Sequence, residues 1–301
     1  MKHIFIVNPM SGKEDSTERI QRELRRFEGR LDYELYRTRA PGDATEYIRE
    51  RIRREPDAAM RFYACGGDGT VNEVANGVCG AKKASFSVYP VGSGNDFVKY
   101  FGGAKRFFDL EKLVQGEETV IDAMDAGGRI AVNVVNLGLD SHVCMTMIKV
   151  KRKPIIGGKN AYYTGVVSGI LCAMRTACHI TIDGEEIPLQ KILLCTLANG
   201  DYVGGSFKCA PRAKVDDGLI ELCAVKPISR LRFPILMGPY TRGEHLDDPR
   251  FRSIVTYRQG KEIRITGEKP LWICVDGEMV QSADMTVRIL PGVLRFAVPK
   301  E

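Results

Sequence analysis

The stretch Phe62-Tyr63-Ala64-Cys65-Gly66-Gly67-Asp68-Gly69-Thr70-Val71-Asn72-Glu73 decides the fold class of the first part of the chain. It reads as the end of a strand, three glycines within four positions, and a helix that begins at Thr70. Glycines let backbone N–H groups approach a phosphate closely, and a helix N-terminus offers unpaired donors and a favourable dipole. Thr70 and Glu73 also have the spacing of a capping box. The stretch predicts a phosphate-binding turn, and a well-capped strand-to-helix turn without a ligand stays open as the alternative.

Two further glycine-containing loops follow predicted strands. Asn8-Pro9-Met10-Ser11-Gly12-Lys13 comes after the first strand, and Pro90-Val91-Gly92-Ser93-Gly94-Asn95-Asp96-Phe97 comes at the end of the fourth. Ligands of open parallel sheets bind beyond the carboxyl ends of the strands, so we expect the three loops to converge. The sequence contains no Gly-x-x-x-x-Gly-Lys-[Ser/Thr] segment, which excludes an ordinary P-loop. The dinucleotide pattern Gly-x-Gly-x-x-Gly is also absent after the first strand.

The first 120 residues alternate between strand and helix patterns. The predicted strands are residues 3–7, 31–36, 61–64 and 86–91, and the predicted helices are residues 18–27, 43–54 and 71–78. Asp43 is expected to cap the second helix. This order predicts a parallel sheet with right-handed crossovers, in an N-terminal three-layer α/β nucleotide-binding domain.

From about residue 119 the pattern changes to short alternating strands separated by turn signals. The predicted strands are residues 119–125, 129–136, 179–182, 191–198, 219–225, 253–257, 262–266, 271–275, 285–290 and 293–298. One long helix is expected at about residues 160–177, and Pro291-Gly292 is expected to join the last strand pair. We predict a mainly antiparallel β-sandwich second domain over residues 121–290. The first domain is expected to comprise residues 1–120 and to be joined by the C-terminal strand, about residues 291–301.

The positive charge of the chain is local. The formal net charge is 44 − 38 = +6, and no acidic residue lies between Asp140 and Asp183. This window contains Lys149, Lys151, Arg152, Lys153, Lys159 and Arg175. Cations beside apolar and aromatic side chains suit an anionic membrane surface, and a solvated loop followed by a core helix is the alternative. Nucleic acid is not an expected partner, because no recognition module accompanies the basic residues.

Composition and cysteine usage indicate an ordinary globular protein. Hydrophobic residues make up 44% and charged residues 27%, which argues against disorder or a disulfide scaffold. The nine cysteines form no Cys-x-x-Cys pair, and the N-terminal residues do not have the pattern of a signal peptide. No apolar stretch approaches the ~18–20 residues that a membrane-spanning helix requires. We therefore expect reduced thiols in a cytoplasmic protein.

Taken together and in order, these motifs resemble the diacylglycerol kinase catalytic-domain family, specifically its small soluble bacterial members, which are distant kin of sphingosine kinases and NAD kinases. The matching elements are Asn8-Pro9-x-Ser11-Gly12-Lys13, Gly66-Gly67-Asp68-Gly69-Thr70-x-Asn72-Glu73, Gly92-Ser93-x-Asn95-Asp96-Phe97, Asp217-Gly218-Leu219 and Asp276-Gly277-Glu278. They cover almost the whole chain. Ser93 stands where the family commonly has Thr, and it keeps the hydroxyl.

The resemblance implies a role for each matching position. Glu278 is similar to the family's general base, and Asp68 is similar to the acid beside the phosphates. A structural Mg²⁺ would be bound by the carboxylate of Asp217 and the backbone carbonyls of Lys214 and Leu219. The implied ATP-binding residues are Asn8, Pro9, Met10, Ser11, Gly12, Thr38, Gly66, Gly67, Asp68, Gly69, Thr70, Val71, Asn72, Ser93, Asn95 and Asp96.

The expected function is an ATP-dependent, Mg²⁺-requiring lipid kinase of phospholipid metabolism. It would transfer the γ-phosphate of ATP to the hydroxyl of diacylglycerol or a related lipid, with Glu278 facing Asp68 across an interdomain cleft. We expect a cytoplasmic protein that associates peripherally with the membrane, and its oligomeric state is left open, a homodimer included. One alternative is a soluble-substrate kinase such as an NAD kinase, which shares Gly-Gly-Asp-Gly-Thr. Another is a non-catalytic, nucleotide-dependent membrane-binding protein.

Overall fold

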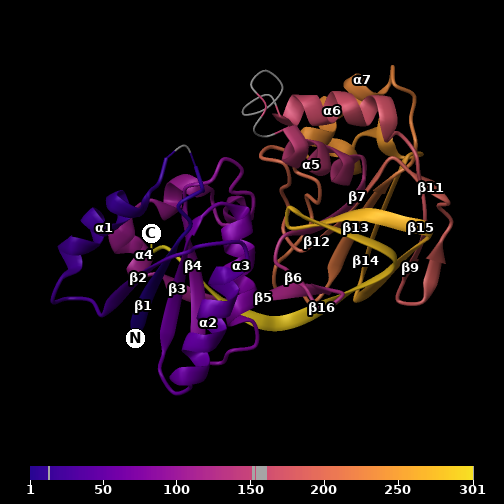
Figure 1. Ribbon diagram of the computed structural model, residues 1–301. Coiled ribbons are helices and arrows are strands. Elements are labelled where there is room, and N and C mark those ends of the chain that lie inside the picture. The colour runs from indigo at the N-terminus through magenta and orange to yellow at the C-terminus, as the bar shows by residue number, and fades with distance from the viewer. Residues whose placement is uncertain (13, 151–152, 154–160, 301) are drawn as a thin grey trace. The chain divides into compact units, whose positions relative to one another are not determined.

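The protein consists of two compact units in its computed structural model, which describes residues 1–12, 14–150, 153 and 161–300 (Figure 1). Unit 1 comprises Met1–Ala123, Val215–Asp217 and Leu290–Glu301. Unit 2 comprises Met124–Lys214 and Gly218–Ile289. Four basic residues considered above, Lys13, Lys151, Arg152 and Lys159, lie outside the described residues.

Unit 1 is built on parallel strands in the order β4-β3-β1-β2. Its strands are β1 (Lys2–Val7), β2 (Tyr33–Arg37), β3 (Met60–Gly66) and β4 (Ala84–Pro90). Its helices are α1 (Thr17–Leu24), α2 (Asp43–Arg54), α3 (Asp68–Val78) and α4 (Leu110–Val114), with 3-10 turns η1 (Arg25–Phe27), η2 (Phe97–Lys99) and η3 (Ala104–Phe107). Because Val7 pairs with both Arg37 and Cys65, and Gly66 pairs with Pro90, the four carboxyl ends lie at one edge of the sheet.

The strand order explains the layers of unit 1. The chain moves from β1 to β2 in one direction and from β2 through β3 to β4 in the other. Right-handed crossovers therefore place α1 on one face of the sheet and α2 and α3 on the opposite face, as Figure 1 shows. Since both faces are covered, every residue of β3 and β4 is buried. The expected three-layer α/β fold is confirmed.

Unit 2 is mainly antiparallel. Its strands are β6 (Ile130–Ala131), β7 (Val134–Gly138), β8 (Thr176–Ala177), β9 (His179–Ile182), β10 (Glu185–Ile187), β11 (Lys191–Ile192), β12 (Leu194–Ala198), β13 (Ile220–Val225), β14 (Val255–Gly260) and β15 (Glu262–Val275). Its helices are α5 (Leu139–Val150), α6 (Ala161–Cys172) and α7 (Phe233–Thr241), followed by η5 (Glu244–Leu246) and η6 (Pro249–Phe251). The chain passes between the units inside β5 (Glu117–Ala126) and β16 (Glu278–Val298).

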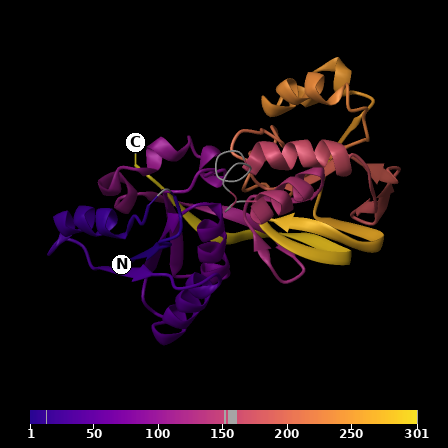
Figure 2. The same ribbon diagram turned by 45° about the horizontal axis from the view of Figure 1, so that its top comes forward.

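The long strand β15 turns the sheet of unit 2 into a sandwich. Its first half pairs with β9, its last three residues pair with β7, and the register against β16 shifts between Thr266 and Leu271. Alternate residues of β7, β12 and β13, such as Leu137, Leu197 and Leu222, point into the core between the layers. The opposite face of these strands packs against α5, α6 and α7, and Figures 1 and 2 both show α6 and α7 on the same side of the β15–β16 hairpin. The expected antiparallel sandwich is confirmed.

Several predicted boundaries in unit 2 are wrong, each for a physical reason. The predicted helix at residues 160–177 ends at Cys172, because Thr176 and Ala177 pair with β11 instead. Residues 262–266 and 271–275 form one strand, since β16 pairs with both. The expected turn at Pro291-Gly292 does not form. Proline lacks a backbone donor, and β16 continues past this point while its neighbour changes from β15 to β4.

Candidate active site

The glycine loops after β3 and β4 lie against each other. An added Cβ on Gly92 would come within 2.4 Å of the Cα of Gly67, and one on Gly66 would come within 2.2 Å of Thr70 Oγ1. The backbone amides of Val91 and Gly92 both donate to the carbonyl of Gly66, at 3.0 and 3.3 Å. Any side chain larger than a hydrogen atom at position 66 or 92 would therefore clash, so both contacts require glycine. The expected approach of these two loops is confirmed.

The loop after β1 joins them. The Asn8 side chain donates from Nδ2 to Thr70 Oγ1 at 3.1 Å. The backbone amide of Asn8 donates to the carbonyl of Cys65, also at 3.1 Å. Gly12 has φ +84°, and a Cβ there would meet the carbonyl oxygen of Val91 at 2.6 Å. Asn8 follows β1 and Thr70 follows β3. These two strands are neighbours in the sheet, and the order in which the chain adds strands changes direction between them. Such a switch point is where ligands bind in open α/β sheets.

Asp68 is held in place by backbone amides. Its Oδ1 accepts from the amides of Asp96 and Phe97, at 2.6 and 3.3 Å, which links the start of α3 to the loop after β4. Helix α3 begins at Asp68 with Gly67 as its N-cap, so the predicted start at Thr70 is wrong by two residues. The first amides of a helix that begins inside the glycine loop face the region in which a phosphate would bind.

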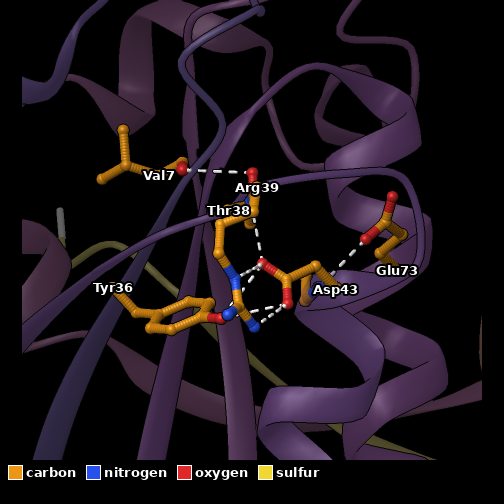
Figure 3. Close-up of polar contacts among 7 residues, drawn as sticks. Val7, Tyr36, Thr38, Arg39, Asp43 and Glu73 are labelled. Carbon is orange, nitrogen blue, oxygen red and sulfur yellow. Dashed lines mark hydrogen bonds and ion pairs between the residues drawn. The ribbon is translucent and has the colours of Figure 1, made fainter.

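A polar network anchors the loop after β2, where Thr38 lies (Figure 3). The Thr38 amide donates to the carbonyl of Val7 at 2.9 Å. Asp43 accepts from the hydroxyl of Tyr36 at 3.0 Å and from the backbone amide of Arg39 at 2.8 Å, and it pairs with the Arg39 guanidinium. These hydrogen bonds, chiefly those from Arg39, lower the pKa of Asp43 to about 2. The network fixes the position of Thr38 beside the end of β1.

Two capping predictions are wrong. Gly42, in a left-handed conformation with φ +86°, is the N-cap of α2, and Asp43 instead binds the loop before it. Glu73 does not complete a capping box with Thr70, because its carboxylate accepts from the amide of Ala44 at 3.2 Å (Figure 3). Glu73 therefore satisfies an amide at the start of α2 and ties that helix to α3.

The other predicted ATP-binding residues lie at the same edge but differ in what they offer. Val71 and Asn72 are buried, so Val71 can reach a ligand only through its backbone. Met10 is 79% exposed, and the amides of Met10 and Ser11 donate to Asn8. The remaining members are the half-buried Pro9, the exposed Gly69 and Ser93, Asn95 with φ +49°, and Asp96, which pairs with Lys99.

In unit 2, Glu278 is the first residue of β16 and pairs with Arg129, which follows the Gly127-Gly128 turn. Asp276 and Gly277, with φ +45° and +93°, form the two-residue turn of the β15–β16 hairpin. The Asp276 carboxylate is buried and accepts from the amides of Val132, Asn133 and Val134, at 2.7 to 3.2 Å. Asp276 therefore anchors the turn and so sets the position of Glu278.

The three predicted Mg²⁺ ligands lie on the segment that leads into β13. Val215–Asp217 belong to unit 1, whereas Lys214 and Leu219 belong to unit 2. Asp217 is exposed, and Gly218 follows it with φ +70°. A carboxylate and two backbone carbonyls are the hard oxygen donors that suit Mg²⁺, so the donor set fits this metal. Within the described ranges, no group of three or more His, Cys, Asp or Glu side chains forms another candidate metal site.

The sequence reasoning did not assign roles to several residues that shape these sites. Arg129, the partner of Glu278, carries no local motif apart from the glycine turn that precedes it. Asp276 belongs to one of the sequence motifs, but only the folded structure shows that its carboxylate is buried and accepts from three backbone amides. The sequence did not indicate the roles of Tyr36 and Arg39, because their partner Asp43 was predicted to be a helix cap.

The start of the acid-free window is helical, whereas the alternative was a solvated loop followed by a core helix. Residues 139–150 form α5, which carries Lys149, and Lys153 follows it as an exposed residue. Among the residues that the structure describes, no helix is long and apolar enough to cross a membrane.

Two family models together match most of the chain. The diacylglycerol kinase catalytic domain matches residues 2–126, and the YegS C-terminal NAD kinase beta sandwich-like domain matches residues 133–298. Curated relatives named diacylglycerol kinase include one from Bacillus subtilis (strain 168). It is 29% identical, and the alignment covers 91% of this chain and 88% of the relative. Another, from Staphylococcus aureus (strain bovine RF122 / ET3-1), is 30% identical, and the alignment covers 91% of this chain and 85% of the relative.

Solved structures show the same fold. A crystal structure of a diacylglycerol kinase from Bacillus anthracis str. Sterne has a TM-score of 0.73 and 22% sequence identity. A second structure from that strain has a TM-score of 0.78 and 23% identity. Each alignment covers 99% of this chain and 97% of the other. At these identities the structures support the two-unit architecture rather than any residue's role.

Proposed function

Because the chain belongs to the diacylglycerol kinase family of lipid kinases, we propose that it transfers the γ-phosphate of ATP to the hydroxyl of diacylglycerol or a related membrane lipid. The observation that carries this proposal is the convergence of four strand-end loops at one edge of the unit 1 sheet. Two of these loops approach so closely, at Gly67 and Gly92, that no side chain fits between them and a ligand could reach the backbone there. Such a surface suits the phosphates of a nucleoside triphosphate.

Unit 1 would bind and orient the nucleotide. Amides of the glycine loops and the first turn of α3 would donate to phosphate oxygens, and Thr70, held by Asn8, would add a hydroxyl. Asp68 would remain in a fixed orientation because two backbone amides bind its Oδ1. Its carboxylate would orient water or cation beside the phosphates, as phosphoryl transfer requires.

Unit 2 would supply the base. Glu278 would accept the proton of the lipid hydroxyl as that oxygen attacks the γ-phosphorus and ADP leaves. Asp276 supports this role by fixing the hairpin turn, and Arg129 by orienting the Glu278 carboxylate through their ion pair until a substrate replaces it. Mg²⁺ would supply charge neutralisation, with Asp217, Lys214 and Leu219 as the oxygen donors for a structural ion.

We place the enzyme in the cytoplasm, peripherally associated with the membrane that contains its lipid. All nine cysteines lie in the described residues and are free thiols, the state that a reducing compartment maintains. A lipid acceptor also requires contact with a bilayer surface, since no described helix crosses one.

The test is phosphate transfer from labelled ATP to a panel of lipids in mixed micelles: diacylglycerol, phosphatidylglycerol, a sphingoid base and a polyprenol. We expect transfer to at least one lipid and a loss of about a hundredfold in Glu278→Gln, the scale of a general base. Glu268→Gln, which changes an exposed acid on β15, is the matched control and should keep wild-type activity. Absence of transfer to every lipid contradicts the proposal, and full activity of Glu278→Gln contradicts the assigned base.

The second candidate is an NAD kinase-like activity, which the match of residues 133–298 to an NAD kinase beta sandwich-like domain favours. Measuring NADP formation from ATP and NAD separates the two. We expect none, and NADP formation without lipid phosphorylation would replace the first proposal with the second.

A further inference from the structure

Four large apolar side chains in α6 and in the segment that leads into α7 are exposed. Val167 and Leu171 of α6 are 57% and 62% exposed, and Leu231 and Ile235, just before and within α7, are 84% and 61% exposed. We call these four residues the α6–α7 face. Single exposed apolar residues are common on protein surfaces, but several of them together mark an interaction site.

Contacts inside unit 2 bring the two segments together. The guanidinium of Arg230 donates to the carbonyls of Ile170 and Leu171, both at 2.9 Å, so the residue before Leu231 is bonded to the end of α6. On the inner side, Ile170 and Met237 pack against the same core cluster. The outward residues Val167 and Leu171 are four positions apart in α6, so they lie on one side of that helix.

The same two segments lack acidic residues. Residues 141–182 contain no Asp or Glu, and neither do residues 222–243. The second stretch contains Lys226, Arg230, Arg232 and Arg242, of which Arg242 pairs with Glu244. Within the described part of the chain, no ion pair links Arg175, Arg230 or Arg232 to an acidic side chain. The face therefore combines exposed apolar groups with positive charge that its own stretches of chain do not neutralise.

We propose that the α6–α7 face docks on the surface of an anionic lipid bilayer, with Leu231 and Ile235 entering the region between headgroups and acyl chains. This inference rests on the proposed function, because it names the surface by which a lipid kinase reaches its substrate membrane. Apolar side chains bounded by cations suit this interface, where burial and attraction to anionic lipids act together. A second copy of the chain fits less well, since a two-fold contact would set this positive face against itself.

The experiment measures binding of the whole protein to sedimented vesicles without ATP. Vesicles of phosphatidylcholine with 30 mol% phosphatidylglycerol, an amount on the order of the anionic lipid in such membranes, are compared with pure phosphatidylcholine. We expect Leu231→Ser/Ile235→Ser to weaken binding to the anionic vesicles about tenfold, as expected when two apolar side chains no longer enter the interface. Arg175→Gln/Arg232→Gln should weaken binding to the anionic vesicles, by up to about fivefold for each charge removed. It should leave the weak binding to phosphatidylcholine vesicles unchanged.

Two controls match these variants. Val120→Ser removes an exposed apolar side chain of unit 1, 51% exposed, and Arg288→Gln removes an arginine of unit 2 that pairs with Glu262. Both should bind vesicles as the wild type does. The proposal is overturned if the α6–α7 variants bind like wild type, or if the controls lose binding equally. A wild-type dimer that dissociates in Leu231→Ser/Ile235→Ser would instead assign the face to a second copy.

A second measurement does not depend on loss of binding. The chain has one tryptophan, Trp272, so Trp272→Phe/Leu231→Trp places the only tryptophan on the face. Its fluorescence should be quenched by brominated lipids in anionic vesicles, and unchanged fluorescence would overturn insertion. Phosphorylation of dihexanoylglycerol dispersed in water keeps the two proposals apart. If docking is wrong but the function is right, this activity remains in every variant. Wild type that phosphorylates neither dihexanoylglycerol nor a water-dispersed short-chain form of any other lipid in the panel counts against the function alone.

Discussion

The carboxyl edge of the unit 1 sheet and the α6–α7 face of unit 2 are two proposed binding regions built in different ways. The first gathers short, contiguous loops in which close backbone approach requires glycine, as where Gly67 meets Gly92. The second consists of ordinary apolar and basic side chains from segments about 60 residues apart, held together by Arg230. Where function depends on backbone geometry, the residue types reveal it, and where it depends on surface composition, only the folded chain does.

The largest effect should come from filling the glycine contact. In Gly92→Ala the new Cβ would lie 2.4 Å from the Cα of Gly67, so the two loops must separate. We expect ATP affinity to fall about a hundredfold, as overpacking at a close backbone contact displaces the amides from the phosphates. Isothermal titration calorimetry with ATP measures this effect. Gly238→Ala, where the nearest atom outside the helix backbone is 3.5 Å from the new Cβ, should bind ATP normally.

If Gly92→Ala instead binds ATP like wild type, the edge of the unit 1 sheet does not work through close backbone approach. Its vesicle binding should stay at the wild-type level, because the α6–α7 face lies in the other unit. A joint loss of ATP and vesicle binding would contradict the separation of the two regions.

A smaller effect concerns the buried histidine of unit 2. Burial lowers the pKa of His245 from 6.5 to about 4, whereas the unfolded chain restores the ordinary value. The unfolded state therefore binds a proton first, and stability is lost as the pH falls from about 6.5 towards 4. We expect the wild type to lose about 2 kcal/mol more than His245→Gln in the free energy of unfolding between pH 7 and pH 5.

Urea denaturation at the two pH values, followed by circular dichroism, measures this difference. His179→Gln is the control, since this histidine is exposed and pairs with Glu186. It should show the wild-type pH dependence. An identical pH dependence in His245→Gln would mean that His245 does not titrate on unfolding. His3 of unit 1 has its pKa lowered to about 4, chiefly by burial, and should account for part of the remaining acid sensitivity.

The smallest effect should come from the network beside Thr38. Asp43→Asn weakens the acceptor of the Arg39 amide and guanidinium, and we expect a loss of about 1 kcal/mol in unfolding free energy, the scale of one hydrogen bond. Thermal denaturation at pH 7 measures it. Asp284→Asn makes the same substitution in a surface ion pair with Arg264 and should cause no measurable change. Equal effects in both variants would show that the loop after β2 does not depend on Asp43.

The sequence allowed much of unit 1 to be predicted because its signals are local. Strand β3 is a run of buried residues, mainly apolar apart from Arg61, that ends at Gly66, and parallel topology then brings Asn8, Gly66 and Gly92 to one edge. The capping predictions failed at Asp43 and Glu73, whose side chains have partners outside their own helix starts. For Glu73 the partner lies 29 residues away in the chain, whereas for Asp43 the nearby Arg39 competes with the helix start for the same carboxylate.

The chain after residue 123 was harder to predict because its elements depend on distant neighbours. Pro291 reads as a turn, yet β16 passes through it since the strand exchanges β15 for β4. Asp276 is a buried carboxylate whose role is visible only beside residues 132–134. The partner of Glu278, Arg129, is about 150 residues away in the chain.

The central claim is that unit 1 binds the nucleotide while Glu278 of unit 2 acts in the transfer step. One measurement tests it most directly: ATP affinity and phosphate transfer to lipid, determined together for Gly92→Ala and Glu278→Gln. We expect Gly92→Ala to lose both, and Glu278→Gln to keep its ATP affinity while transfer falls about a hundredfold. Wild-type transfer by Glu278→Gln, or unaltered ATP affinity in Gly92→Ala, would contradict it.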